Sequence, residues 1–203
     1  MQILKINQKN FKKIIAISIN LIKQGKIIVC PTDTVYGLLA DATDKKAVEK
    51  LFKIKKRPKR KPLPIFVRDL KQAKEIAKVD KKQEKFLRSA WPGKITAVLE
   101  RKKTKTNLYG VDKKTIALRI PKYKLLINLV KQLNRPLTGT SANISGKPAS
   151  TRIEEVLNQF TLRRGSGQGK HQPDLVIDAG NLITSKPSRV IDLTEEKPKI
   201  LRK

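Results

Sequence analysis

The sequence has few of the residues on which metal centres and nucleophilic catalysis commonly depend. Cys30 is the only cysteine, so no disulfide forms within the chain and no cysteine cluster binds a metal. His171 is the only histidine, which excludes a zinc site built on histidines and argues against a Ser-His-Asp triad. Aromatic residues make up only 4%, so we expect a core of isoleucine, leucine and valine.

Long apolar segments are lacking too. No segment approaches the ~20 apolar residues that cross a membrane, and residues 1–7 carry no apolar run of signal-peptide length. No close pair of carboxylates occupies a scaffold recognisable for acid–base catalysis. We therefore expect a soluble, cytoplasmic protein without membrane contacts. A length of 203 residues fits a single domain spanning 1–203, and an apolar content of 38% is sufficient for its core.

Acidic residues are scarce relative to basic ones, with 17 Asp and Glu against 47 Lys and Arg and a formal net charge of +30. Such an excess favours a nucleic-acid partner, because lysine and arginine neutralise backbone phosphates. An AT-rich coding sequence explains it equally well, since the chain has 35 lysines, 12 arginines and 22 isoleucines. Composition leaves both causes open, and RNA stays a candidate partner.

Apolar residues recur with helical or strand periodicity along most of the chain. Helices are predicted between Asn10 and Gly25, after the N-caps Asp69 and Asp80, and over 44–56, 125–133 and 151–160, the last opened by a capping box at Thr151–Glu154. Strands are predicted over 26–30, 63–67, 95–101, 115–120, 137–140, 175–178, 189–193 and 199–202. Because helices and strands alternate irregularly, we expect one mixed α/β domain around a twisted sheet.

Two loops of contrasting chemistry stand out. Residues 137–149 are nearly uncharged and rich in serine, threonine and glycine, which supply donors and close backbone approach. Residues 55–63 concentrate positive charge at the end of a helix. Facing one another, they suggest a polyphosphate site, with the hydroxyls of residues 31–38 nearby. Residues 165–171 look like a phosphate loop, but their spacing does not fit one, and 163–172 is interpreted as a linker or lid.

These segments resemble a known family. Lys55-Lys56-Arg57 followed by Ser141-Ala142-Asn143, embedded in P-T-D-T-V-Y-G-L and T-S-A-N-I-S-G-K-P, is similar to the YrdC-like threonylcarbamoyl-AMP synthases from about Ile27 onward. The resemblance implies a YrdC-like fold and a nucleotidyltransferase that joins L-threonine, bicarbonate and ATP, releasing pyrophosphate. It also implies Mg²⁺ held mainly by the ATP phosphates. The product would pass to a downstream machinery that modifies adenosine 37 of tRNAs.

The resemblance also implies roles for individual residues. The four residues expected to act in catalysis are Lys55, Arg57, Ser141 and Asn143. Those expected to bind ATP are Arg57, Lys61, Thr115, Ser141, Asn143, Ala149 and Arg202. Those expected to bind threonine are Thr34, Phe66, Arg119, Gly139 and Ser188. Arg119 is assigned to the threonine carboxylate because a guanidinium matches it with two parallel donors. No residue is assigned to a metal.

The chain departs from the family pattern in places, and other readings remain open. Phe66 stands where many members have histidine, and Arg189 follows Ser188 where a small hydroxyl residue is usual. With the sequence ending at Lys203, we expect a short, single-domain form. The main alternatives are an RNA-binding module or a paralogue without this activity, and a weaker one takes Lys56–Lys61 as a nuclear-localisation signal. The neutral loop at 137–149 favours the enzyme, because a charge-driven RNA binder has no need of it.

Overall fold

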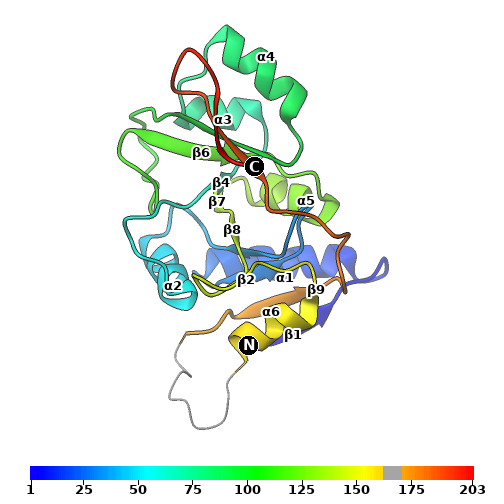
Figure 1. Ribbon diagram of the computed structural model, residues 1–203. Helices are drawn as coiled ribbons and strands as arrows, with labels where there is room; N and C mark the ends of the chain where they lie inside the picture. The colour runs from blue at the N-terminus through cyan, green and yellow to red at the C-terminus, as the bar shows by residue number, and fades with distance from the viewer. Residues whose placement is uncertain (162–170) are drawn as a thin grey trace.

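A computed structural model describes residues 1–161 and 171–203 (Figure 1). The strands are β1 (Gln2–Lys5), β2 (Ile28–Cys30), β3 (Gly37–Leu39), β4 (Ile65–Phe66), β5 (Ile95–Glu100), β6 (Thr115–Arg119), β7 (Leu137–Thr138), β8 (Thr140–Ser141), β9 (Leu175–Asp178), β10 (Arg189–Asp192) and β11 (Lys199–Arg202). The helices are α1 (Phe11–Lys23), α2 (Lys45–Lys55), α3 (Leu70–Ile76), α4 (Lys81–Ala90), α5 (Lys124–Leu133) and α6 (Ile153–Phe160).

The strands form two sheets rather than the single sheet expected. The first sheet has the order β1-β9-β2-β3-β8, and the second has the order β11-β10-β5-β6-β4-β7. Both mix parallel and antiparallel pairs: β2 runs parallel to β9 and antiparallel to β3, while β5 runs parallel to β10 and antiparallel to β6. The mixed α/β class is thereby confirmed. The extent of the domain, 1–203, stays a prediction.

The predicted strand over 137–140 is divided between the two sheets at Gly139. Thr138 pairs with Ile65 in the second sheet, and Thr140 pairs with Leu38 in the first. A Cβ atom on Gly139 would lie 2.9 Å from the ring of Phe66, so any larger residue would displace that ring. Alternating side chains look the same whether a strand stays in one sheet or changes sheets, so sequence periodicity gave no sign of this crossing.

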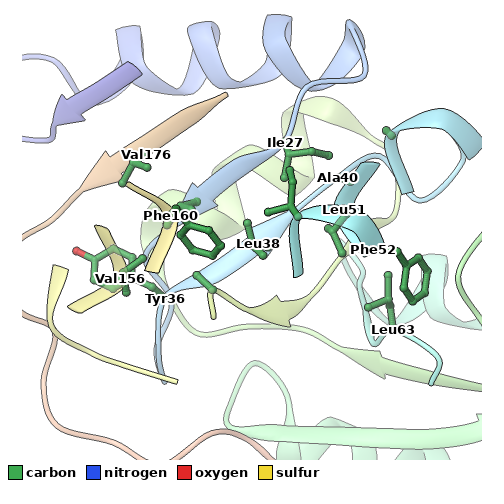
Figure 2. Close-up of a cluster of buried hydrophobic side chains, with 14 of the residues drawn as sticks. Ile27, Tyr36, Leu38, Ala40, Leu51, Phe52, Leu63, Val156, Phe160 and Val176 are labelled. Atoms are coloured by element: carbon green, nitrogen blue, oxygen red, sulfur yellow. The ribbon is translucent and has the colours of Figure 1, made fainter. Parts of the chain in front are cut away.

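Helices cover the first sheet on both faces. Figure 2 shows α2 and α6 packed over one face, where Leu51, Phe52, Val156 and Phe160 meet Leu38 and other strand residues. On the other face, α1 and α5 pack together around a cluster that includes Ile28 and Leu39. In Figure 1, α3 and α4 lie at the opposite end of the molecule from α2 and α6 and cover the second sheet. The clusters consist mainly of isoleucine, leucine and valine, as the composition predicted.

Three aspartates start helices with their side chains. Asp44 accepts hydrogen bonds from the backbone N–H of two residues in the first turn of α2, and Asp69 accepts one in α3. Asp80 forms a full capping box with Gln83 at the start of α4. Each such cap satisfies backbone donors that the helix itself leaves unpaired. These contacts confirm the predicted N-caps of α3 and α4 and explain why α2 begins where expected.

Asn10 occupies the N-cap position of α1 as predicted, whereas the capping box predicted at Thr151–Glu154 is wrong. Asn10 makes no side-chain bond to the end of α1, because it exchanges reciprocal hydrogen bonds with Asn7 instead. The predicted capping box at Thr151–Glu154 is absent, since α6 begins one residue later with Arg152 as its N-cap. The Ser150 hydroxyl accepts from the Arg152 N–H and donates to a carboxylate in the first turn. The Ser150 hydroxyl, and not that of Thr151, therefore makes the side-chain hydrogen bonds at the start of α6.

Two further predictions concern the proposed lid and contact with a membrane. Most of the proposed linker or lid, residues 163–170, lies outside the described residues. None of the helices in the described part of the chain combines the length and apolar composition needed to cross a membrane.

Candidate active site

A cleft of about 110 Å³ opens where the two sheets meet, beside the crossing at Gly139. Residues of the first sheet line one side and residues of the second line the other, and the segment that leads into β10 closes one end. The lining residues are Thr32, Thr34, Val35, Tyr36, Gly37, Arg57, Pro64, Phe66, Arg119, Gly139, Thr140, Ser141, Pro187, Ser188 and Arg202.

Most residues predicted for the site meet in this cleft. Those that line it are Thr34, Arg57, Phe66, Arg119, Gly139, Ser141, Ser188 and Arg202. Those that do not line it are Lys55, Lys61, Thr115, Asn143 and Ala149. The individual roles of both groups stay predictions, but the first group shares one small space although its members are spread across the chain.

Lys55 lies behind the cleft wall and holds that wall in place. Its side chain leaves the last turn of α2, and the residue is 2% exposed. The ammonium donates to the carbonyl of Ser141 at 2.6 Å, to the carbonyl of Asn143 at 3.0 Å and to Asn143 Oδ1 at 2.7 Å. Burial, together with repulsion from Arg57, lowers the pKa of Lys55 to about 7. Its contacts are those of a clamp on the Ser141–Asn143 loop.

Asn143 completes this loop from within. Its Oδ1 accepts from the Ser141 hydroxyl at 2.6 Å, and its Nδ2 donates to the carbonyl of Lys147 at 2.6 Å. With the bond from Lys55, the amide uses both its acceptor and its donor inside the protein. Asn143 is buried and does not line the cleft. Among the described residues of the Ser-x-Asn motif, only Ser141 lines it.

Arg57 reaches the cleft from the basic loop that follows α2. Its Nε donates to the carbonyl of Lys61 at 3.0 Å and its Nη2 to the carbonyl of Pro62 at 2.9 Å. These bonds orient the guanidinium without neutralising it, because carbonyl oxygens carry no net charge. Burial and the nearby Arg202 lower the pKa of Arg57, which reflects the concentration of positive charge in the cleft.

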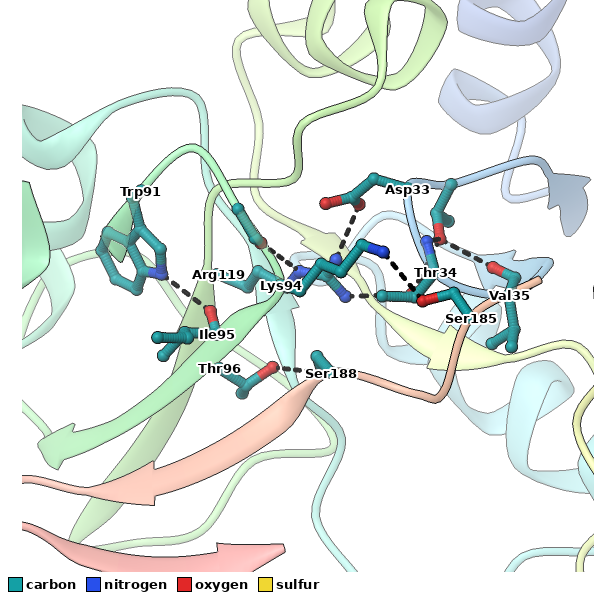
Figure 3. Close-up of polar contacts among 12 residues, drawn as sticks. Asp33, Thr34, Val35, Trp91, Lys94, Ile95, Thr96, Arg119, Ser185 and Ser188 are labelled. Atoms are coloured by element: carbon teal, nitrogen blue, oxygen red, sulfur yellow. Dashed lines mark hydrogen bonds and ion pairs between the residues drawn. The ribbon is translucent and has the colours of Figure 1, made fainter. Parts of the chain in front are cut away.

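Arg119 projects from the end of β6 and is held from three sides, as Figure 3 shows. Its Nε donates to the carbonyl of Gly93 at 2.9 Å, its Nη1 to Thr34 Oγ1 at 3.3 Å and its Nη2 to Asp33 Oδ1 at 2.6 Å. Its guanidinium carbon also lies 5.8 Å from the centre of the Phe66 ring. Each terminal nitrogen keeps one N–H beyond these contacts. The side chain is thus fixed before any ligand arrives.

Phe66 contributes an apolar wall to the cleft. The ring approaches the Arg119 guanidinium at a distance typical of a cation–π contact and packs against Gly139. A phenyl ring donates no hydrogen bond, so any contact made here with a ligand is one of packing.

The closing end of the cleft is fixed by Ser188 and Arg202. Arg202 in β11 donates through Nη2 to the Ser188 carbonyl at 2.6 Å and through Nε to the same oxygen at 2.9 Å. The Ser188 hydroxyl lies 2.8 Å from Thr96 Oγ1, a contact visible in Figure 3. Burial lowers the pKa of Arg202. Like Arg57, this arginine is oriented by neutral oxygens.

Two residues of the P-T-D-T-V-Y-G-L stretch differ from their sequence interpretation. The Tyr36 hydroxyl, considered for ligand binding, donates to the Gly180 carbonyl at 2.6 Å and accepts from Ala179 N–H at 3.1 Å. It therefore braces the segment that leads toward Ser188. Asp33 received no role, yet it forms the buried ion pair with Arg119. The sequence does contain a signal for this role of Asp33, because an acidic residue inside a motif is unusual in so basic a chain.

Known proteins are similar to this sequence over almost its whole length. The family model Sua5_yciO_yrdC, described as "Telomere recombination", matches residues 20–203. Threonylcarbamoyl-AMP synthase of Pyrococcus abyssi is 35% identical over 189 residues, which are 93% of this chain and 53% of that protein. The putative threonylcarbamoyl-AMP synthase of Methanocaldococcus jannaschii is 36% identical over 196 residues, which are 97% of this chain and 88% of that protein. The chain thus spans about half of the first relative and most of the second.

A solved structure agrees with the sequence comparison. The crystal structure of P. abyssi Sua5 complexed with L-threonine superimposes with a TM-score of 0.82 at 33% identity, over 99% of this chain and 56% of that one. The chain therefore belongs to the Sua5/YciO/YrdC family.

Proposed function

We propose that this protein is a nucleotidyltransferase that makes L-threonylcarbamoyl-AMP and pyrophosphate from L-threonine, bicarbonate and ATP. The observation that carries the proposal is the cleft itself. It unites Arg119, which we assign to the threonine carboxylate, with Arg57 and Arg202, whose charge is not compensated by a carboxylate among the described residues. The relatives named threonylcarbamoyl-AMP synthase support the same activity.

The chemistry needs positioned charge and no side-chain nucleophile. The amino nitrogen of threonine adds to the carbon of bicarbonate, and water leaves to give the carbamate. A carbamate oxygen then attacks the α-phosphorus of ATP, and the bond from that phosphorus to the bridging oxygen breaks to release pyrophosphate. Negative charge grows on the phosphate oxygens during this step, and prearranged guanidinium groups stabilise it. We assign that task to Arg57 and Arg202, which line the cleft.

The cleft is too small to enclose both threonine and ATP. A pocket that encloses a drug-sized ligand commonly has ~300–1,000 Å³, several times the volume found here. We therefore assign threonine to the part of the cleft beside Arg119, with the adenosine of ATP extending beyond the cleft. Lys61, Thr115 and Ala149, which do not line the cleft, remain candidates for contacts with that outer portion.

The metal and the macromolecular partners belong to the proposal as well. The described residues include no cluster of three or more His, Cys, Asp or Glu side chains able to hold a metal ion. We propose that Mg²⁺ enters with ATP, bound mainly by its phosphates, where it would neutralise part of their charge. The product would serve a downstream machinery that modifies tRNA, and the net charge of +30 supports contact with that RNA.

Incubation of the purified protein with ATP, threonine and bicarbonate tests the activity through pyrophosphate release. Release is expected only when all three substrates are present, because the carbamate is the attacking group. Mass spectrometry should detect threonylcarbamoyl-AMP in the same reaction. Equal pyrophosphate release without threonine or without bicarbonate would show a different reaction. No release together with salt-sensitive RNA binding would favour the RNA-binding module instead.

A further inference from the structure

The three arginines that line the cleft differ in their partners. Arg57 and Arg202 donate to backbone carbonyls, with Arg202 also near the Ser188 hydroxyl. Within residues 1–161 and 171–203, neither is paired with a carboxylate, whereas Arg119 is paired with Asp33. Arg57 and Arg202 therefore bring uncompensated positive charge to the cleft, whereas Arg119 belongs to an ion pair of zero net charge.

The Asp33–Arg119 pair is buried and tightly made. The joined atoms are 2.6 Å apart, and the two side chains are 8% and 5% exposed. The second carboxylate oxygen, Asp33 Oδ2, is buried and has no hydrogen-bond partner among the described residues. A buried acceptor left unpaired costs about 1–3 kcal/mol, so this carboxylate is not there for stability alone.

The negative charge of Asp33 changes which ligands Arg119 attracts. A lone buried guanidinium would draw any anion, and the strongest anion present would be the polyphosphate of ATP. A carboxylate in direct contact with Arg119 repels a second anion and attracts an ammonium group. An α-amino acid carries both charges on groups bonded to the same carbon and has no net charge, so it loses least from this pairing.

We propose that Asp33 is a specificity-determining residue: it divides the cleft so that polyphosphate binds at Arg57 and Arg202, and a zwitterionic α-amino acid binds at Arg119. The inference rests on the proposed function for the identity of the two substrates. Asp33 does not line the cleft. It acts through Arg119, and its effect is on which ligand that arginine accepts.

The test compares ligands with and without an ammonium group. L-threonine and 2,3-dihydroxybutanoate share the carboxylate, the methyl group and the side-chain hydroxyl, but the second is an anion. Isothermal titration calorimetry should show that the wild-type protein prefers threonine. Asp33→Asn keeps the shape and an acceptor for Arg119 but removes the charge. Its preference for threonine over the anion is expected to fall about tenfold or more, the scale on which one neighbouring charge shifts an equilibrium.

Inorganic pyrophosphate supplies a second measurement, which needs no variant. In the wild-type protein, pyrophosphate should compete with ATP and leave threonine affinity unchanged. In Asp33→Asn, it should compete with threonine as well, because Arg119 then accepts phosphate. Competition between pyrophosphate and threonine in the wild-type protein would overturn the inference even if the variant failed to fold.

Asp41→Asn is the matched control. Asp41 is also a buried aspartate paired with an arginine, Arg135, at 2.9 Å, but neither residue lines the cleft. Its substitution should change stability without changing the ligand preference. An unchanged preference in Asp33→Asn, in a protein that binds threonine, would refute the division of the cleft alone. A wild-type protein that binds no threonine would refute the proposed function and this inference with it.

Discussion

Replacing Arg57 by alanine should lower kcat/KM for ATP about a hundredfold or more, the effect of removing one prearranged donor from a developing oxyanion. Arg57 lines the cleft and its charge is oriented only by backbone carbonyls, so a phosphate is the partner for which it is available. Its hydrogen bonds lie at the protein surface, so the melting temperature should change little. Pyrophosphate release under varied ATP concentration measures the first effect, and thermal unfolding measures the second.

Two further variants separate charge from loop structure. Arg60 lies in the same loop, but its side chain is exposed and does not line the cleft. The Arg60→Ala protein should therefore retain wild-type kinetics. Arg57→Lys keeps a cation but loses the planar donors to the loop carbonyls, so an intermediate rate is expected. Equal losses in Arg57→Ala and Arg60→Ala would mean that the loop needs both arginines for its conformation and that Arg57 has no special place at a phosphate.

The fold was predictable where local chemistry decides the structure. Asp44, Asp69 and Asp80 begin helices because each can accept from the following backbone N–H groups, and the sequence shows such residues directly. The number of sheets was not predictable, because strand pairing depends on partners far apart in the chain. Gly139 illustrates the difference, since the sequence shows a glycine in a strand but not that the chain changes sheets there.

The site was predictable through motifs, and less so in the task of each residue. Lys55 and Arg57 stand two positions apart, and both look like cations for phosphate. Lys55 is turned inward by the last turn of α2, whereas Arg57 follows a residue in the left-handed conformation, Lys56, and turns to the cleft. Asp33 was overlooked for a related reason. Its meaning comes from Arg119, which is distant in sequence and adjacent only after folding.

Replacing Lys55 by methionine should destabilise the protein and abolish turnover together. The change removes the donor shared by Ser141 O, Asn143 O and Asn143 Oδ1. Ser141 O keeps the Asn143 N–H and Asn143 Oδ1 keeps the Ser141 hydroxyl, so the Asn143 carbonyl is the acceptor left unpaired. A buried acceptor left unpaired costs about 1–3 kcal/mol, so a loss of that size in the free energy of unfolding is expected. The loop that carries the Ser141 hydroxyl into the cleft would then lose its fixed position, and pyrophosphate release would fall with it.

Lys53→Met is the matched control, because Lys53 lies on the same helix and is exposed. It should change neither stability nor rate. The pair of results distinguishes a clamp from a catalytic cation, since Arg57→Ala is expected to lose activity alone. A Lys55→Met protein with wild-type stability and no activity would assign Lys55 to the reacting phosphates, as the sequence first suggested.

The pH dependence of stability gives an independent measure of the Lys55 contact. Its pKa is lowered from 10.5 to about 7, so between those values the unfolded chain holds a proton that the folded protein has released. Linkage then makes the contribution of Lys55 to stability rise with pH through that window and stay constant below about pH 7. Because Lys55→Met lacks the group, the stability difference between wild type and variant should grow in urea unfolding from about pH 7 to pH 9. A difference that stays flat would show that the surrounding oxygens hold the ammonium charged in the folded protein, with the clamp equally strong throughout.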